Sequence, residues 1–159
     1  MKIREATRDD AESVSQLASE FHRYLRSLGD PTRFNFNAEA YVRDGFGPNR
    51  AFFGLVAEEE EKTVGYLLYH FGYDTDHSRR LMYVIDLYVD LEYRANGIGK
   101  ALMKRASEEA LSQGATDLWW GVYERNTSAL KFYESLGAKH IKGVYFMSIK
   151  AEALSEKST

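Results

Sequence analysis

The sequence contains no cysteine and only two prolines. Without cysteine the chain has no disulfide, no thiol nucleophile and no thiolate-bound zinc. Its 21 lysines and arginines form no basic block, so binding to nucleic acid through many phosphate contacts is not expected. No run of about 18 apolar residues is present, and the N-terminal stretch MKIREATRDD lacks the apolar region of a signal peptide. We therefore expect a cytoplasmic protein that binds neither nucleic acid nor a membrane.

The composition is typical of a single folded domain over residues 1–159. Hydrophobic residues make up 44% of the chain and aromatic residues 14%, with a net charge of −3, which is ordinary for a globular protein. No repeat or linker divides the chain. None of the four histidines has the spacing of a metal-binding motif, so no metal is expected.

Hydrophobic periodicity predicts a mixed α/β architecture. The expected strands are residues 1–6, 51–58, 64–71, 81–89, 117–123, 138–141 and 144–150. The expected helices are one that ends before Gly29, a short one near residues 37–44, one that runs from Ile98 to Gly114, and one within residues 126–137. The acidic run between the second and third strands is expected to be a hairpin turn. The early strands should be antiparallel, and the third helix should cross over between two parallel strands.

Residues 93–102, YRANGIGKAL, have the glycines and basic residues of a phosphate-binding loop. A Walker loop is excluded because Arg94 and Ala101 stand where glycine and serine or threonine are needed. A dinucleotide fingerprint is excluded because Leu102 replaces its third glycine. The remaining pattern is R-x-x-G-x-G, formed by Arg94, Gly97 and Gly99 at the start of a helix. Backbone N–H groups there can hold a pyrophosphate, although glycines also occur in ordinary strand–helix turns.

The stretch from Ile85 to Met103, followed by NTSALKFYESLGA at 126–138, resembles the GCN5-related N-acetyltransferase (GNAT) superfamily. The resemblance extends over essentially the whole chain. It implies a mixed sheet with splayed central strands, helices on both faces, and acetyl-CoA as the acetyl donor. The cofactor-binding residues implied by the resemblance are Leu87, Tyr88, Val89, Arg94, Ala95, Asn96, Gly97, Ile98, Gly99, Lys100, Asn126 and Phe132.

Two residues are candidates for the chemistry. Tyr133 matches the tyrosine that family members place near the thioester sulfur, where a neutral phenol can protonate the departing thiolate; without that match it would be interpreted as a core aromatic. Asp86 lies in the middle of an apolar strand, where a carboxylate needs partners and can serve as a general base. It could instead cap a turn or pair with an arginine. Glu124 is a second candidate for the general base and is expected on the side of the site where the substrate binds.

The resemblance is strongest to diamine and thialysine acetyltransferases, through RDGFG, YHFGYDTD and DLYV. It implies that Asp74 and Asp76 lie at the amine entrance, although both could simply belong to a polar loop. Polyamine-acetylating members carry a glutamate where this chain has Ile85, and an acid and a tryptophan where it has Lys142 and Val144. A small mono-amine or amino-acid-like substrate is therefore as well supported as a diamine.

The expected activity is acetyl transfer from acetyl-CoA to a primary amine of a small molecule, by direct attack in a ternary complex. The alternatives are a protein or peptide N-acetyltransferase and a non-catalytic acyl-CoA-binding sensor. Many relatives are homodimers, so the resemblance also predicts a homodimer, by fold analogy.

Overall fold

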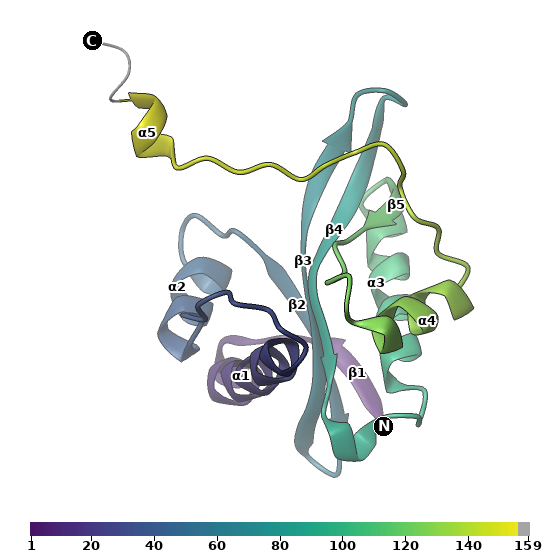
Figure 1. The fold of residues 1–159 in the computed structure, drawn as a ribbon. Coiled ribbons are helices and arrows are strands. Elements are labelled where there is room, and N and C mark those ends of the chain that lie inside the picture. The colour runs from purple at the N-terminus through teal and green to yellow at the C-terminus, as the bar shows by residue number, and fades with distance from the viewer. Residues whose placement is uncertain (156–159) are drawn as a thin grey trace.

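Five strands form one mixed sheet in the order β1-β2-β3-β4-β5 in the computed structural model, which describes residues 1–155 (Figure 1). The strands are β1 (Lys2–Glu5), β2 (Phe53–Glu59), β3 (Lys62–Asp74), β4 (Arg79–Val89) and β5 (Ala115–Trp119). The α-helices are α1 (Ala11–Ser27), α2 (Ala38–Phe46), α3 (Ile98–Ser112), α4 (Thr127–Ser135) and α5 (Ala151–Ser155). Two short 3-10 turns, Arg8–Asp10 and Leu91–Tyr93, precede α1 and the glycine loop.

The strand connections follow the sequence pattern. Strands β1 to β4 pair antiparallel, and β4 pairs with β5 in parallel after the α3 crossover. Glu60 and Glu61 form the tip of the β2–β3 hairpin with φ of 48° and 66°, the left-handed geometry that matches the twist of a tight hairpin. The predicted acidic turn and the predicted parallel crossover are both confirmed.

Helices cover both faces of the sheet, with α1 and α2 on one side and α3 and α4 on the other (Figure 1). Successive strand residues point to opposite faces, so the two apolar sets alternate along the chain. Tyr66 and Leu68 of β3 pack in the cluster that contains α1 and α2. Leu67 of β3 packs with α3 residues such as Leu102 in the other cluster. The central strands are apolar on both faces for this reason.

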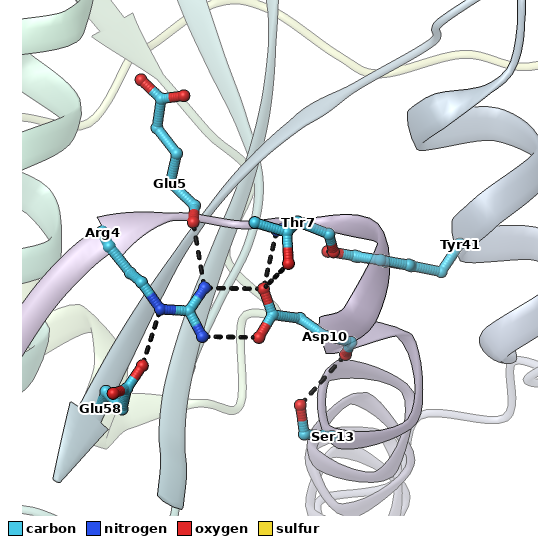
Figure 2. Close-up of polar contacts among 7 residues, drawn as sticks. All are labelled: Arg4, Glu5, Thr7, Asp10, Ser13, Tyr41 and Glu58. Carbon is cyan, nitrogen blue, oxygen red and sulfur yellow. Dashed lines mark hydrogen bonds and ion pairs between the residues drawn. The ribbon is translucent and has the colours of Figure 1, made fainter. Parts of the chain in front are cut away.

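A charged cluster joins β1 to the start of α1 (Figure 2). Arg4 donates two hydrogen bonds of 2.8 Å to the carboxylate of Asp10 and one of 2.7 Å to Glu58. Asp10 also accepts from the backbone N–H of Thr7 at 2.7 Å, which caps the first turn. Burial raises the pKa of Asp10, but the bonds from Arg4 and Thr7 bring it below its ordinary value. Thr7 and Asp10 thus form a capping box at the start of the helix, with Arg4 as an additional partner.

A β-bulge in β4 separates the sheet into a paired part and an open part. Tyr69 pairs with Val84 and Leu68 pairs with Asp86, so Ile85 has no partner on β3. The parallel pairing of β4 with β5 ends just before, at Tyr83. A bulge bends its strand and increases its twist, and from this point β4 presents a free edge on the β5 side. The strand predicted over residues 117–123 therefore ends at Trp119, earlier than the sequence pattern indicates.

The two C-terminal strands predicted over 138–141 and 144–150 are absent from the described structure. Residues 138–150 form neither a helix nor a strand, and α5 follows them. Their apolar side chains have strand-like composition, but a strand exists only when a neighbouring strand accepts its backbone hydrogen bonds. Within residues 1–155 this segment finds no such neighbour. The prediction was wrong for the chain described by itself.

Candidate active site

A cavity of about 360 Å³ opens between the end of β4, the glycine loop, α1 and α4. All of the predicted cofactor-binding residues except Asn96 line it, together with Tyr133. Asn96 is exposed, and its side chain donates a 3.4 Å hydrogen bond to the carbonyl of Tyr93, a contact within the loop itself. Three segments distant in sequence, namely α1, β4 with the glycine loop, and α4, therefore form one pocket at the open edge of β4.

The glycine loop has the shape of an anion cradle. Ala95 and Gly97 both have positive φ, 63° and 78°, which turns successive N–H groups toward one side. A Cβ on Gly97 would meet no atom within 4 Å, so this position faces open space. A Cβ on Gly99 would lie 3.2 Å from the ring of Phe132. The first glycine thus provides the backbone geometry, and the second allows α3 to approach α4 closely.

Arg94 is held beside this cradle by three groups. Its Nε donates to the carbonyl of Val89 at 2.9 Å. Its guanidinium lies 5.2 Å from the ring centres of both Tyr24 and Tyr88, close enough for cation–π attraction. Arg94 lines the cavity, so its other guanidinium N–H groups can meet an anion there. The Tyr24 contact was not predicted, because it comes from α1, far away in the sequence.

Helix α1 forms a wall of the cavity, a role that the sequence pattern did not indicate. Phe21 and Tyr24 line the pocket, and Phe21 stacks on Tyr88 with ring centres 5.4 Å apart. Their three-residue spacing places both on one face of the helix. The signal in the sequence that could have indicated this role is the hydroxyl group of Tyr24, which stands beside the apolar face of the helix.

Asn126 connects α1 to α4 at the same cavity. It is 6% exposed, and its Oδ1 accepts from the Tyr24 hydroxyl and from the Ala129 N–H, each at 3.2 Å. The bond to Ala129 caps the N-terminus of α4. Because Oδ1 takes both bonds, the Nδ2 group remains available as a donor toward the cavity.

Tyr133 lies on α4 with its ring packed between aromatic neighbours. The rings of Trp120 and Phe132 lie 4.8 Å and 5.1 Å away. Burial raises the pKa of Tyr133 to about 12, and the nearby charge of Asp86 adds to the effect. The phenol is therefore protonated at neutral pH and can act as a proton donor.

Asp86 lies beside this cavity rather than in its lining. Burial raises the pKa of its carboxyl group, and a 3.3 Å hydrogen bond from the Tyr66 hydroxyl opposes that shift. A carboxyl group with a raised pKa is better matched to proton transfer near neutral pH than an ordinary aspartate. Tyr66 was not singled out from the sequence, because its pairing with Asp86 depends on the β3–β4 register.

The three acids assigned to the amine side are not part of the cavity lining. Asp74 is 7% exposed and binds His77 at 2.8 Å and Arg79 at 3.0 Å, which closes the β3–β4 hairpin. Burial raises the pKa of Asp74, but these hydrogen bonds bring it below its ordinary value. Asp76 and Glu124 are both exposed. The carboxylate of Asp74 is therefore occupied by hydrogen bonds within the hairpin, whereas the carboxylates of Asp76 and Glu124 face solvent.

The comparisons with known proteins agree with this arrangement. The model of the Acetyltransferase (GNAT) family matches residues 11–138. The chain therefore belongs to the GNAT family of acetyltransferases and is an enzyme of that class.

Among individual relatives, thialysine N-epsilon-acetyltransferase of Bos taurus is 34% identical over 165 residues, covering 97% of this chain and 95% of that protein. Spermidine/spermine N(1)-acetyltransferase-like protein 1 of Homo sapiens is 30% identical over 144 residues, covering 86% of this chain and 20% of that protein. A tetramutant of the BH1408 protein from Bacillus halodurans has a TM-score of 0.80 at 28% identity, covering 94% of this chain and 100% of that one. The predicted fold class is confirmed by this likeness.

Two absences apply to residues 1–155. None of their helices combines the length and the apolar character needed to cross a bilayer. No group of three or more histidine, aspartate or glutamate side chains among them is placed to hold a metal ion.

Proposed function

We propose that this protein transfers an acetyl group from acetyl-CoA to a primary amine of a small molecule. One observation carries the proposal: a single cavity at the free edge of β4 joins the glycine-loop cradle to Tyr133 of α4, which is half-buried and protonated. The family membership and the relatives, which are named for acetylation of thialysine and polyamines, support the same reaction class.

The residues present fit acetyl-CoA. The open cradle at Gly97 and the guanidinium of Arg94 suit a pyrophosphate. Beyond the bulge, residues 87–89 have no partner strand on the β5 side among residues 1–155. Their backbone groups on that side, apart from the Val89 carbonyl that Arg94 already binds, can hydrogen-bond the amide-bearing arm as an added strand would. The Nδ2 of Asn126 adds a donor near that arm. When bound, acetyl-CoA supplies the activated acetyl group as a thioester.

The chemistry is then divided between Asp86 and Tyr133. Asp86 accepts a proton from the incoming ammonium, directly or through water, because a protonated amine cannot attack a carbonyl. The amine nitrogen bonds to the acetyl carbon and the carbon–sulfur bond breaks. Tyr133 donates its proton to the leaving sulfur, and the second proton that the nitrogen loses as the amide forms passes to the Tyr133 phenolate or to solvent. Glu124 is a second group for the first proton transfer, since its exposed carboxylate can relay a proton to solvent.

The proposed substrate is an amino-acid-like amine or a diamine. Ile85 is 40% exposed at the bulge, immediately before Asp86, and gives this part of the site an apolar surface instead of a charge. The exposed carboxylate of Asp76 can attract a cation at longer range. Asp74 supports the loop by binding His77 and Arg79. Fewer acids close to Asp86 favour an amine with one positive charge over a polyamine.

A panel of amines incubated with acetyl-CoA and followed by mass spectrometry tests the proposal. Thialysine, lysine, ornithine, diamines, polyamines and a lysine-containing peptide should be compared at equal concentration. We expect acetylation of small amines and slower reaction of polyamines. Acetylation of the peptide alone would instead identify a protein acetyltransferase, and tight acetyl-CoA binding without turnover of any amine would identify a sensor. Assembly into a homodimer and a cytoplasmic location remain predictions of the sequence.

A further inference from the structure

The side chain of Tyr24 joins the two helical layers at the cavity. Helix α1 lies on one face of the sheet and α4 on the other (Figure 1), and the parallel pairing of β4 with β5 ends at Tyr83. Beyond that end, the hydroxyl of Tyr24 on α1 donates a 3.2 Å hydrogen bond to Oδ1 of Asn126 at the start of α4. Tyr24 therefore reaches a residue of the opposite layer where the sheet is open.

The carboxamide of Asn126 has one fixed orientation. The backbone N–H of Ala129 can only donate, so the atom that accepts its 3.2 Å bond is the side-chain oxygen. The hydroxyl of Tyr24 binds the same oxygen, and none of the hydrogen bonds within residues 1–155 involves Nδ2. Every buried side-chain nitrogen or oxygen of these residues has a hydrogen-bond partner. The unbonded Nδ2 must therefore reach open space, which at this residue is the cavity.

The ring of Tyr24 acts on a second donor. The guanidinium of Arg94 lies 5.2 Å from the ring centres of both Tyr24 and Tyr88, and attraction to two aromatic rings restricts the positions that it can take. Phe21, which precedes Tyr24 by three residues on α1, stacks on Tyr88 with ring centres 5.4 Å apart. Helix α1 is thus anchored on β4 at the level where Tyr24 meets Arg94.

Tyr24 contributes little to the apolar core. Among the described residues it belongs to neither of the two hydrophobic clusters, whereas Phe21 packs in the cluster of α1 and α2. Tyr24 is half-buried, and it lines the cavity with Arg94 and Asn126. A tyrosine that served only packing would lie in one of the clusters. Its contacts are instead with two polar side chains of the cofactor cavity.

We propose that Tyr24 is a positioning residue for acetyl-CoA, whose hydroxyl orients the carboxamide of Asn126 and whose ring holds the guanidinium of Arg94. This inference rests on the proposed function, because both donors are assigned there to the cofactor. One side chain of α1 thus sets two donors that come from different segments of the chain. Tyr24 touches none of the reacting groups, so its loss should weaken cofactor binding and leave the chemical step unchanged.

Two substitutions separate the hydroxyl from the ring, with coenzyme A binding measured by calorimetry. Tyr24→Phe keeps the ring beside Arg94 and should weaken binding about fivefold, the usual effect of one hydrogen bond. Tyr24→Leu removes both groups and should weaken binding about 25-fold, since the cation–π contact is lost as well. Tyr41→Phe is the matched control, because its hydroxyl donates to the carbonyl of Thr7 away from the cavity. It should lower the melting temperature and leave coenzyme A affinity unchanged.

A double-mutant cycle distinguishes positioning from a general loss of structure. In an Asn126→Ala background, Tyr24→Phe should cause no further loss of affinity, because the group that it orients is gone. With an amine that the natural chain acetylates, Tyr24→Phe should raise the KM for acetyl-CoA and leave kcat unchanged. The same fivefold loss in the Asn126→Ala background overturns the positioning role, as does full affinity of both Tyr24 variants. A natural chain that does not bind coenzyme A contradicts the proposed function as well.

Discussion

The hydroxyl of Tyr66 on β3 donates a 3.3 Å hydrogen bond to Oδ2 of Asp86 on β4. Burial raises the pKa of Tyr66 well above its ordinary value, and the charge of Asp86 raises it further. Tyr66 therefore stays protonated and acts only as a donor to this carboxylate. Burial raises the pKa of Asp86 while the bond from Tyr66 lowers it, and burial has the larger effect. This pair determines at which pH Asp86 can accept a proton.

The first prediction concerns this hydrogen bond. Tyr66→Phe removes the group that favours the ionised carboxyl, so the pKa of Asp86 should rise further. Because the base must be ionised to accept a proton, activity increases as pH rises through that pKa. The acid limb of the kcat/KM profile should shift to higher pH in the variant. Tyr69→Phe, another buried tyrosine on β3 that does not bond Asp86, is the control and should leave the limb in place. An unshifted limb in Tyr66→Phe would show that Asp86 is not the titrating base.

The second prediction concerns the proton donor. Tyr133→Phe keeps the ring that packs on Trp120 but removes the hydroxyl, so kcat should fall about 100-fold, as is common when a general acid is removed. Acetyl-CoA affinity by calorimetry should stay nearly unchanged. Because the pKa of Tyr133 is raised to about 12, its ionisation should cause no loss of activity between neutral pH and about pH 10. A variant with full kcat removes Tyr133 from the mechanism.

The third prediction separates backbone strain from cofactor binding. Gly97 and Gly137 have similar positive φ, 78° and 90°, and a Cβ on either would meet no neighbouring atom. Alanine at either position should lower the free energy of unfolding by about 1 kcal/mol, because L-residues disfavour this conformation. Only Gly97→Ala should also weaken acetyl-CoA binding, by about tenfold or 1.4 kcal/mol, since its new methyl group faces the cradle. Equal binding by both variants would exclude the loop as the pyrophosphate site.

The fourth prediction concerns stability and pH. Asp10→Asn removes the charge that binds Arg4, and should lower the free energy of unfolding by about 2 kcal/mol at neutral pH. The pKa of Asp10 is lowered in the folded state, so its contribution is present above the unfolded value of about 3.9 and is lost as pH falls through the folded value. The difference between the two proteins should therefore shrink below about pH 4. Urea unfolding at several pH values measures it, with exposed Asp9→Asn as the control, which should unfold like the natural chain.

Local patterns explain what was predicted correctly. The apolar runs of β3 and β4 and the helical spacing in α1 and α3 depend on neighbours in sequence, so they could be recognised without the structure. The glycine loop was recognised for the same reason. Gly97 requires a positive φ, and glycine is the residue that adopts it without strain.

Errors and omissions arose where a residue's role depends on a distant part of the chain. Residues 138–150 were predicted to form two strands, although their own sheet supplies no neighbour for them. The expected place of Asp74 at the amine entrance stays a prediction, and the sequence did not indicate that the hairpin turn brings His77 and Arg79 to its carboxylate. Tyr24 was not connected with the cavity, because it lies about 70 residues before Arg94 and meets it only through helix packing.

The sequence by itself determined the order of elements as far as α4, the GNAT resemblance, the glycine loop before α3 and the two residues proposed for catalysis. These features depend on residue type and short-range spacing, which the chain carries before it folds. Only the tertiary structure decided that Tyr66 bonds Asp86, that Arg94 lies against Tyr24 and Tyr88, and that β4 has a free edge beyond Ile85. Those relationships depend on strand register and helix packing between segments far apart in the chain, because a one-residue shift in register turns a side chain to the opposite face of the sheet.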